Sequence, residues 1–194
     1  MPDHANAQKE TPSQTAGPYV HIGCIPSVAG LDGPYAEDLG NRAVEDGAEG
    51  QRITITGRIV DGAGEPLLDA MIESWHCDAA GYYPGQPGAD PAVKGFCRLA
   101  TDGNTGEFTL RTIKPGASGA QAPHIALWIT ARGINIGLQT RIYFEDEDND
   151  TDPLLTQIRP PGRRQSLIAT QTGDGTYRFD IHLQGARETV FLDI

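Results

Sequence analysis

Residues 51–62 read QRITITGRIVDG, and the alternation in this stretch decides the fold class. Ile53, Ile55 and Ile59 alternate with polar residues, which is the period-two pattern of a half-buried strand, and Asp61-Gly62 supplies a turn. Further short runs with strand character follow at 70–77, 96–100, 107–113, 125–131, 138–144, 176–183 and 189–192. About eight strands at this spacing predict an all-β sandwich. Brief helical turns are expected at 153–158 and 165–169.

Residues 1–50 show no such periodicity. Prolines recur through this segment together with many glycines, which argues against a long helix and leaves room for one short helical turn near 36–44. A non-periodic segment of this length is unusual inside a compact domain, so it is either disordered or an arm that becomes ordered by lying on another chain. We therefore divide the chain into an arm, residues 1–50, and a sandwich domain, residues 51–194.

The charge of the chain excludes several classes of partner. The net charge of -11 and the isoelectric point of about 4.7 disfavour contact with phosphate backbones and anionic lipids, so we expect no nucleic-acid or membrane binding. The N-terminus lacks the apolar region of a signal peptide, and no apolar run approaches the roughly 20 residues of a membrane span. Cys24, Cys77 and Cys97 form no CxxC pair, which fits a reducing compartment and predicts a cytoplasmic protein.

An acidic run at 145–152, with aspartates at alternate positions, raises the question of calcium binding. An EF-hand loop needs glycine at its sixth position and a bidentate acid at its twelfth. Counted from Asp146, those positions hold Thr151 and Gln157. We therefore interpret the run as a solvated loop.

Four segments carry residue types that bind substrates or metals: WHCDAAGYY at 75–83, KPG at 114–116, PHIA at 123–126 and ARGIN at 131–135. In this order, together with DGAG at 61–64, TDGNTGEF at 101–108, RIYF at 141–144 and the tail from Tyr177, they resemble the intradiol ring-cleaving dioxygenases. The similarity covers nearly the whole chain from Thr11. The stretch TPSQTAGPYVHIG at 11–23 resembles in particular the α-type chains of the members that cleave protocatechuate.

In the catalytic members of that family, two tyrosinates and two histidines bind ferric iron, and such donors suit Fe(III). The histidines follow an H-x-H pattern, because side chains two apart on a strand share a face. By this resemblance Tyr83 and His124 match ligand positions, whereas Ser118 and Ala126 stand at the other two. The resemblance therefore implies a vestigial ligand set, with no metal and no catalytic residue in this chain. Taken alone, Tyr83 fits a packing residue at a strand end, and His124 fits a buried, hydrogen-bonded histidine at a strand start.

The resemblance also implies a role. A related β subunit would hold the Fe(III), and this chain would complete the pocket for a catechol within an α–β hetero-oligomer, with its arm on the β subunit. Arg132, Thr15, Gly17, Pro18 and Tyr19 would contact the substrate, since a ring carboxylate that leaves water needs a cation. Taken alone, Arg132 is equally a surface ion-pair residue and residues 13–19 a mobile tail.

Two alternatives remain. An autonomous metalloenzyme would need replacement ligands such as His76 or Cys77, but neighbours on a strand face opposite ways. A plain binding module on the same sandwich would be a stable monomer without an enzyme partner.

Overall fold

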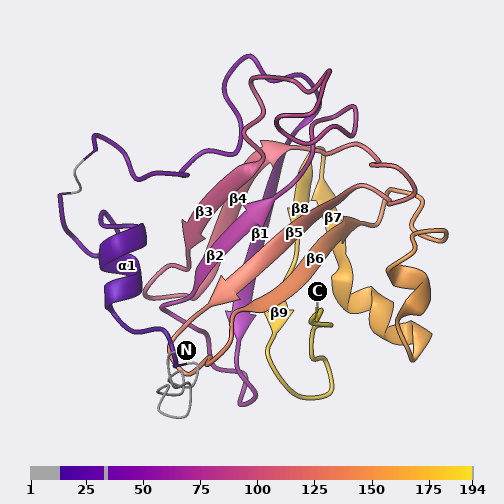
Figure 1. Cartoon of the computed structure of the whole chain (residues 1–194). Coiled ribbons are helices and arrows are strands. Elements are labelled where there is room, and N and C mark those ends of the chain that lie inside the picture. The colour runs from indigo at the N-terminus through magenta and orange to yellow at the C-terminus, as the bar shows by residue number, and fades with distance from the viewer. Residues whose placement is uncertain (1–13, 33–34, 194) are drawn as a thin grey trace, which may run out of the picture.

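The computed structural model describes residues 14–32 and 35–193, which form a β-sandwich with few helical segments (Figure 1). The helical elements among them are α1 (Tyr19–Cys24), η2 (Leu155–Gln157) and η3 (Pro161–Leu167). The strands are β1 (Arg52–Val60), β2 (Met71–Trp75), β3 (Phe96–Ala100), β4 (Glu107–Ile113), β5 (His124–Thr130), β6 (Leu138–Phe144), β7 (Ile168–Gly173), β8 (Thr176–Arg178) and β9 (Ile181–His182). The predicted all-β sandwich is confirmed.

The strands follow one hydrogen-bonded path, β3-β2-β5-β6-β7-β8-β1-β4, and β9 pairs with β1. Neighbours on the path are antiparallel except at the parallel β6–β7 and β1–β8 contacts. The β6–β7 junction is short, with the pairs Tyr143↔Ile168 and Phe144↔Ala169. This junction lets the path bend from one layer to the other, and Figure 1 shows β2, β5 and β6 passing in front of β1 and β8.

The core lies between the two layers. Ile53, Ile55 and Ile59 point into it from β1, as their alternation predicts, and Ile125 and Ile129 reach it from β5. Because side chains alternate along a strand, Leu127 also points into this core, whereas His124, Ala126 and Trp128 lie on the opposite face of β5. This opposite face of β5 carries His124 and Ala126, two of the four positions that the resemblance relates to metal ligands.

A glycine fixes how closely two segments approach in this core. A Cβ on Gly57, in the middle of β1, would lie 1.9 Å from the carbonyl oxygen of Phe179 and 2.6 Å from the ring of Phe108. Only glycine allows the segment after β8 to lie directly on β1.

Several element predictions agree with the structure and several are wrong. The strands at 96–100, 107–113 and 138–144 have the predicted bounds. The predicted strand 176–183 is divided into β8 and β9, and the predicted strand 189–192 is reduced to an isolated bridge between Gln139 and Leu192. The turn expected at 165–169 spans the end of η3 and the start of β7, a strand that the sequence did not predict.

The arm also differs from expectation in its helical content. No helix forms at 36–44, where Gly40 has φ +80° and Val44 bridges to Val93; the described part of the arm instead contains α1. Residues 1–13 and 33–34 of the predicted arm lie outside the described residues. Large apolar side chains of the described part are exposed: Tyr19, Ile22, Val28, Leu31, Tyr35 and Leu39.

No helix in the described ranges is both long enough and apolar enough to cross a lipid bilayer.

Candidate functional site

Tyr83 and His124 meet at one end of the β2–β5 pair. Tyr83 lies in the loop between β2 and β3, and His124 opens β5. The Tyr83 Oη lies 3.5 Å from the His124 Nε2, at the limit of a hydrogen bond. Trp75, the last residue of β2, stacks on the Tyr83 ring with centroids 5.9 Å apart and planes 17° apart. The structure thus brings together Tyr83 and His124, the two residues that match ligand positions by the resemblance.

Both side chains are held in their neutral forms. His124 is 2% exposed, and its Nδ1 lies 2.8 Å from the Ala122 carbonyl oxygen, so Nδ1–H donates to that carbonyl and Nε2 is the acceptor that faces Tyr83. Burial lowers the pKa of His124, and burial raises the pKa of Tyr83. At neutral pH the pair therefore consists of a phenol and a neutral imidazole.

The other two ligand positions offer no donor of the required type. Ala126 lies on the same outward face of β5 as His124 and pairs with Trp75 on β2. Ser118 pairs through its backbone with Gln121 in the loop after β4. This loop packs closely on the β2 end, because a Cβ on Gly81 would lie 2.0 Å from the Ala117 carbonyl oxygen.

Arg141 is part of this centre, and our sequence analysis missed it. It stands on β6 directly opposite Ala126, and its Nη1 lies 2.8 Å from Gln121 Oε1 and 3.3 Å from Tyr143 Oη. The Tyr143 hydroxyl in turn donates to Asp152 Oδ1 at 3.2 Å. The available signal was the RIYF motif, because positions 141 and 143 share a strand face with the histidine of the neighbouring strand.

The donor set does not fit ferric iron. One phenol and one imidazole are present where the resemblance implies four ligands, and a methyl group and a serine stand at the other positions. Across residues 14–32 and 35–193, no three His, Cys, Asp or Glu side chains are placed to share a metal ion.

The replacement ligands of the autonomous alternative are occupied by other contacts. His76 is buried, with Nε2 2.7 Å from Thr112 Oγ1 and Nδ1 2.7 Å from the Cys77 carbonyl oxygen. Cys77 donates its thiol to the Gly116 carbonyl oxygen at 3.3 Å, and burial raises the pKa of this thiol to about 11. A protonated, hydrogen-bonded thiol is a poor metal ligand.

The residues predicted to contact substrate form a second group. Thr15 Oγ1 accepts a hydrogen bond from the Gly133 backbone N–H at 2.6 Å, which ties the arm to the loop of Arg132. Gly17 and Pro18 lead into α1, and Tyr19, at its start, is 83% exposed. Arg132 is also exposed, with Nε 3.5 Å from Asp69 Oδ2.

These two groups lie at opposite ends of β5. His124 begins the strand and Arg132 lies two positions beyond its last residue, so roughly 20–25 Å separates them at the usual rise per residue. Arg132 therefore cannot act on a molecule bound between Tyr83 and His124. A substrate at Arg132 needs a reaction centre other than that of Tyr83.

The acidic run packs against a lysine. Lys114 Nζ lies 2.6 Å from both Asp146 Oδ2 and Glu147 Oε1, and the Tyr177 hydroxyl also donates to Asp146. These contacts raise the pKa of Lys114 despite the opposing effect of burial, so the ammonium stays charged. The run joins the KPG loop to the sandwich, which is more than the solvated loop that we predicted.

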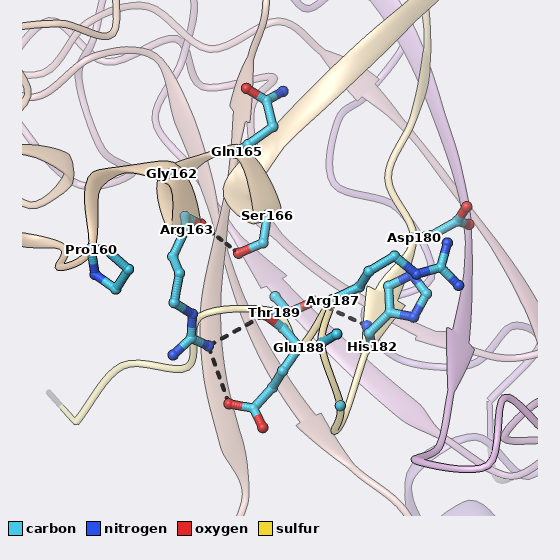
Figure 2. Close-up of a pocket in the computed structure, with 12 residues that line it drawn as sticks. Pro160, Gly162, Arg163, Gln165, Ser166, Asp180, His182, Arg187, Glu188 and Thr189 are labelled. Carbon is cyan, nitrogen blue, oxygen red and sulfur yellow. Dashed lines mark hydrogen bonds and ion pairs between the residues drawn. The ribbon is translucent and has the colours of Figure 1, made fainter.

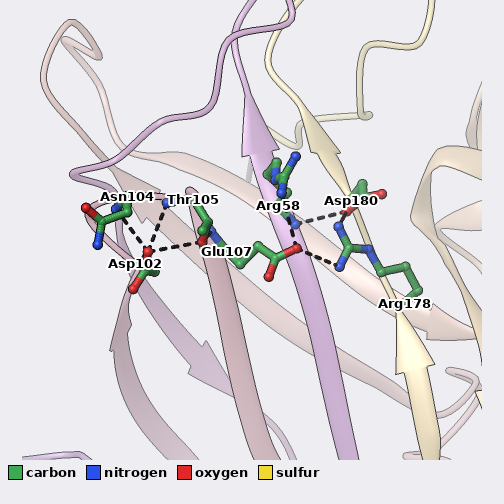
Figure 3. A network of polar contacts seen from close by, with 7 residues as sticks. All are labelled: Arg58, Asp102, Asn104, Thr105, Glu107, Arg178 and Asp180. Atoms are coloured by element: carbon green, nitrogen blue, oxygen red, sulfur yellow. Dashed lines mark hydrogen bonds and ion pairs between the residues drawn. The ribbon is translucent and has the colours of Figure 1, made fainter.

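Two other polar features contain none of the predicted site residues. Figure 2 shows the residues that line a pocket between η3 and the C-terminal segment, including the Arg163–Glu188 ion pair at 3.1 Å; the volume of the pocket is about 820 Å³. Figure 3 shows a network in which Glu107 lies 3.4 Å from both Arg58 and Arg178. The latter pairs are partly exposed, and each contributes at most about 1 kcal/mol to stability.

Comparison with known proteins gives the family. The dioxygenase family model matches residues 28–185. The chain is 45% identical to the protocatechuate 3,4-dioxygenase alpha chain of Pseudomonas putida, over 95% of this chain and 96% of that one. It is 34% identical to the protocatechuate 3,4-dioxygenase beta chain of Burkholderia cepacia, over 81% of this chain and 75% of that one.

Among solved structures, the dioxygenase domain of a dioxygenase–carbohydrate-binding fusion protein from Streptomyces sp. SirexAA-E superimposes with a TM-score of 0.57. It is 28% identical and covers 80% of this chain and 96% of that domain. Sequence and structure agree over most of the sandwich. The chain belongs to the intradiol ring-cleavage dioxygenase family.

Proposed function

We propose that this chain is the non-catalytic α subunit of protocatechuate 3,4-dioxygenase, and that a related β subunit holds the ferric iron. The observation that carries the proposal is the incomplete donor set, in which only Tyr83 and His124 remain. The near full-length match to an alpha chain supports the same assignment.

Arg132 is the residue that we assign to substrate binding. Protocatechuate carries a ring carboxylate, and a guanidinium binds a carboxylate through paired, charge-assisted hydrogen bonds. Arg132 projects from the end of β5 with 67% of its side chain exposed, and Asp69 is its weak partner among the described residues. A surface group of this kind is available to a pocket in an adjoining subunit.

The arm supplies the other contacts. Thr15 is anchored to the Arg132 loop, so Gly17, Pro18 and Tyr19 follow at the same end of β5. We assign these residues to the wall of the β subunit's pocket, where they orient the ring and exclude water. The exposed apolar side chains of the arm, such as Val28 and Leu31, would be buried on the β subunit.

The assignment to this family implies the reaction of the complex. Ferric iron held by the β subunit would supply the activation of the catechol toward dioxygen. The ring bond between the two hydroxylated carbons would be cleaved, and both atoms of dioxygen would be incorporated into 3-carboxy-cis,cis-muconate. This chain holds the carboxylate of the substrate through Arg132 and contributes no ligand. The three cysteines are free, which supports a reducing, cytoplasmic location.

Co-purification with a candidate β chain, followed by an iron count, tests the proposal. One iron per pair is expected, with none in the isolated chain. Iron bound to this chain alone, with a visible tyrosinate–iron band and turnover, would establish the autonomous enzyme. A stable monomer that forms no complex with any β chain in size-exclusion chromatography would establish the binding module.

A further inference from the structure

The centre between Tyr83 and His124 contains a positive charge that the protein itself supplies. Arg141 pairs directly with Ala126 across β5 and β6. Side chains in such a pair project from the same face, with Cβ atoms about 4.5–5.5 Å apart. The alanine methyl leaves room for the guanidinium on the face that His124 shares.

This guanidinium is fixed in place. Its Nη1 donates to Gln121 Oε1 at 2.8 Å and to the Tyr143 hydroxyl at 3.3 Å, and its Nε is buried without a partner. The buried carboxylate of Asp152 is linked to Arg141 through the Tyr143 hydroxyl.

The Asp152 carboxylate also accepts hydrogen bonds from backbone N–H groups. Its two carboxylate oxygens accept N–H groups from Ala122, Leu154 and Leu155 at 2.8–3.0 Å. No described carboxylate lies within ion-pair distance of Arg141. The positive charge of Arg141 is therefore not neutralised by an ion pair, and it acts on the space next to Tyr83 and His124.

The charge acts on both remaining donors. Burial lowers the pKa of His124, and Arg141 lowers it further. Burial raises the pKa of Tyr83, and Arg141 opposes that rise. Both effects have the sign of a cation close to the two side chains.

We infer that Arg141 excludes metal ions from this centre, so that the missing ligands are only one of two barriers to iron binding. The inference rests on the proposed function in taking Tyr83, Ser118, His124 and Ala126 as former ligand positions and in testing the chain in complex with a β chain. A metal ion placed between Tyr83 and His124 would meet the guanidinium at short range, and the repulsion grows in proportion to the charge of the ion. Arginine cannot relieve this repulsion by losing its proton.

A consequence separates this inference from the loss of ligands alone. If only donors were missing, Ala126→His would restore an H-x-H pair and, with Tyr83, give three donors on one face. If Arg141 also excludes metal, the same variant stays empty until the charge is removed.

The test uses cobalt(II) as the probe and the full chain purified in complex with its β chain. Three backgrounds are compared: Ala126→His alone, Ala126→His with Arg141→Gln, and Ala126→His with Arg141→Lys as the charge-retaining control. Cobalt is counted per copy of this chain after gel filtration, and iron is counted separately. Circular dichroism verifies that each variant is folded.

We expect close to one cobalt for the Gln variant, with an affinity at least about a hundredfold above that of the other two. Equal cobalt binding with and without Arg141 would overturn the inference, and so would folded variants that all remain empty. If Ala126→His with Arg141→Gln fails to fold, Ala126→His with Arg141→Met replaces it as the variant without the positive charge. The iron count of the wild-type complex judges the proposed function independently, because the wild-type chain has neither the full ligand set nor a centre free of the Arg141 charge.

Discussion

Replacing Arg132 tests how this chain takes part in catalysis. In the complex, Arg132→Ala removes the cation that we assign to the substrate carboxylate. Hydrogen bonds to charged groups contribute about 1.5–3 kcal/mol, and about 1.4 kcal/mol corresponds to a factor of ten. Since 67% of the Arg132 side chain is exposed in this chain, water competes for the guanidinium. The smallest loss of binding free energy that we expect is therefore the lower end of that range. We expect kcat/KM for protocatechuate to fall about 10- to 100-fold.

The assay compares protocatechuate with plain catechol, which lacks the carboxylate. Catechol turnover and iron content should remain unchanged in Arg132→Ala. Asp69→Asn removes the competing partner of Arg132, so KM for protocatechuate should fall by a factor of no more than about five. Arg187→Ala, at an exposed arginine of the pocket in Figure 2, is the matched control. An equal loss for both substrates in Arg132→Ala would refute the carboxylate assignment.

Three further predictions concern stability. Gly57→Ala should destabilise the fold by roughly 3 kcal/mol in urea denaturation, because the new methyl meets the Phe179 carbonyl oxygen. Tyr143→Phe should lower the free energy of unfolding by about 1–3 kcal/mol, since it removes the hydroxyl that donates to the buried carboxylate of Asp152. His76 has a pKa lowered by burial, so below about pH 6.5 the unfolded chain takes up a proton that the folded chain resists. As the pH is lowered below this value, the free energy of unfolding of the wild type should therefore decrease. The decrease should be steeper than in His76→Gln by up to about 1.4 kcal/mol per pH unit.

Controls for these predictions come from the same chain. Gly103→Ala places a methyl where no atom lies within 4 Å, and it should leave stability nearly unchanged. Tyr82→Phe alters an exposed tyrosine and should be neutral. A Gly57→Ala protein as stable as Gly103→Ala would contradict the close approach of the two segments. A Tyr143→Phe protein as stable as Tyr82→Phe would contradict the buried hydrogen bond, and identical pH profiles for His76→Gln and wild type would contradict the neutral buried histidine.

The sequence by itself determined what depends on local pattern. The alternation around Ile55 gave the strand and its inward face, since period two is a property of neighbouring residues. The absence of a second imidazole was readable at Ala126, because both positions of an H-x-H pair lie on one strand. The strand β7 was not readable, because Ile168 and Ala169 are strand residues only through their pairing with Tyr143 and Phe144.

Only the tertiary structure decided which distant residues share a site. Thr15 meets Gly133 across 118 positions of sequence, and Arg141 faces Ala126 across a strand pair. The placement of Arg132 and His124 at opposite ends of β5 also required the register of the sheet. Such contacts depend on chain closure and strand pairing, and no local preference of the residues encodes them.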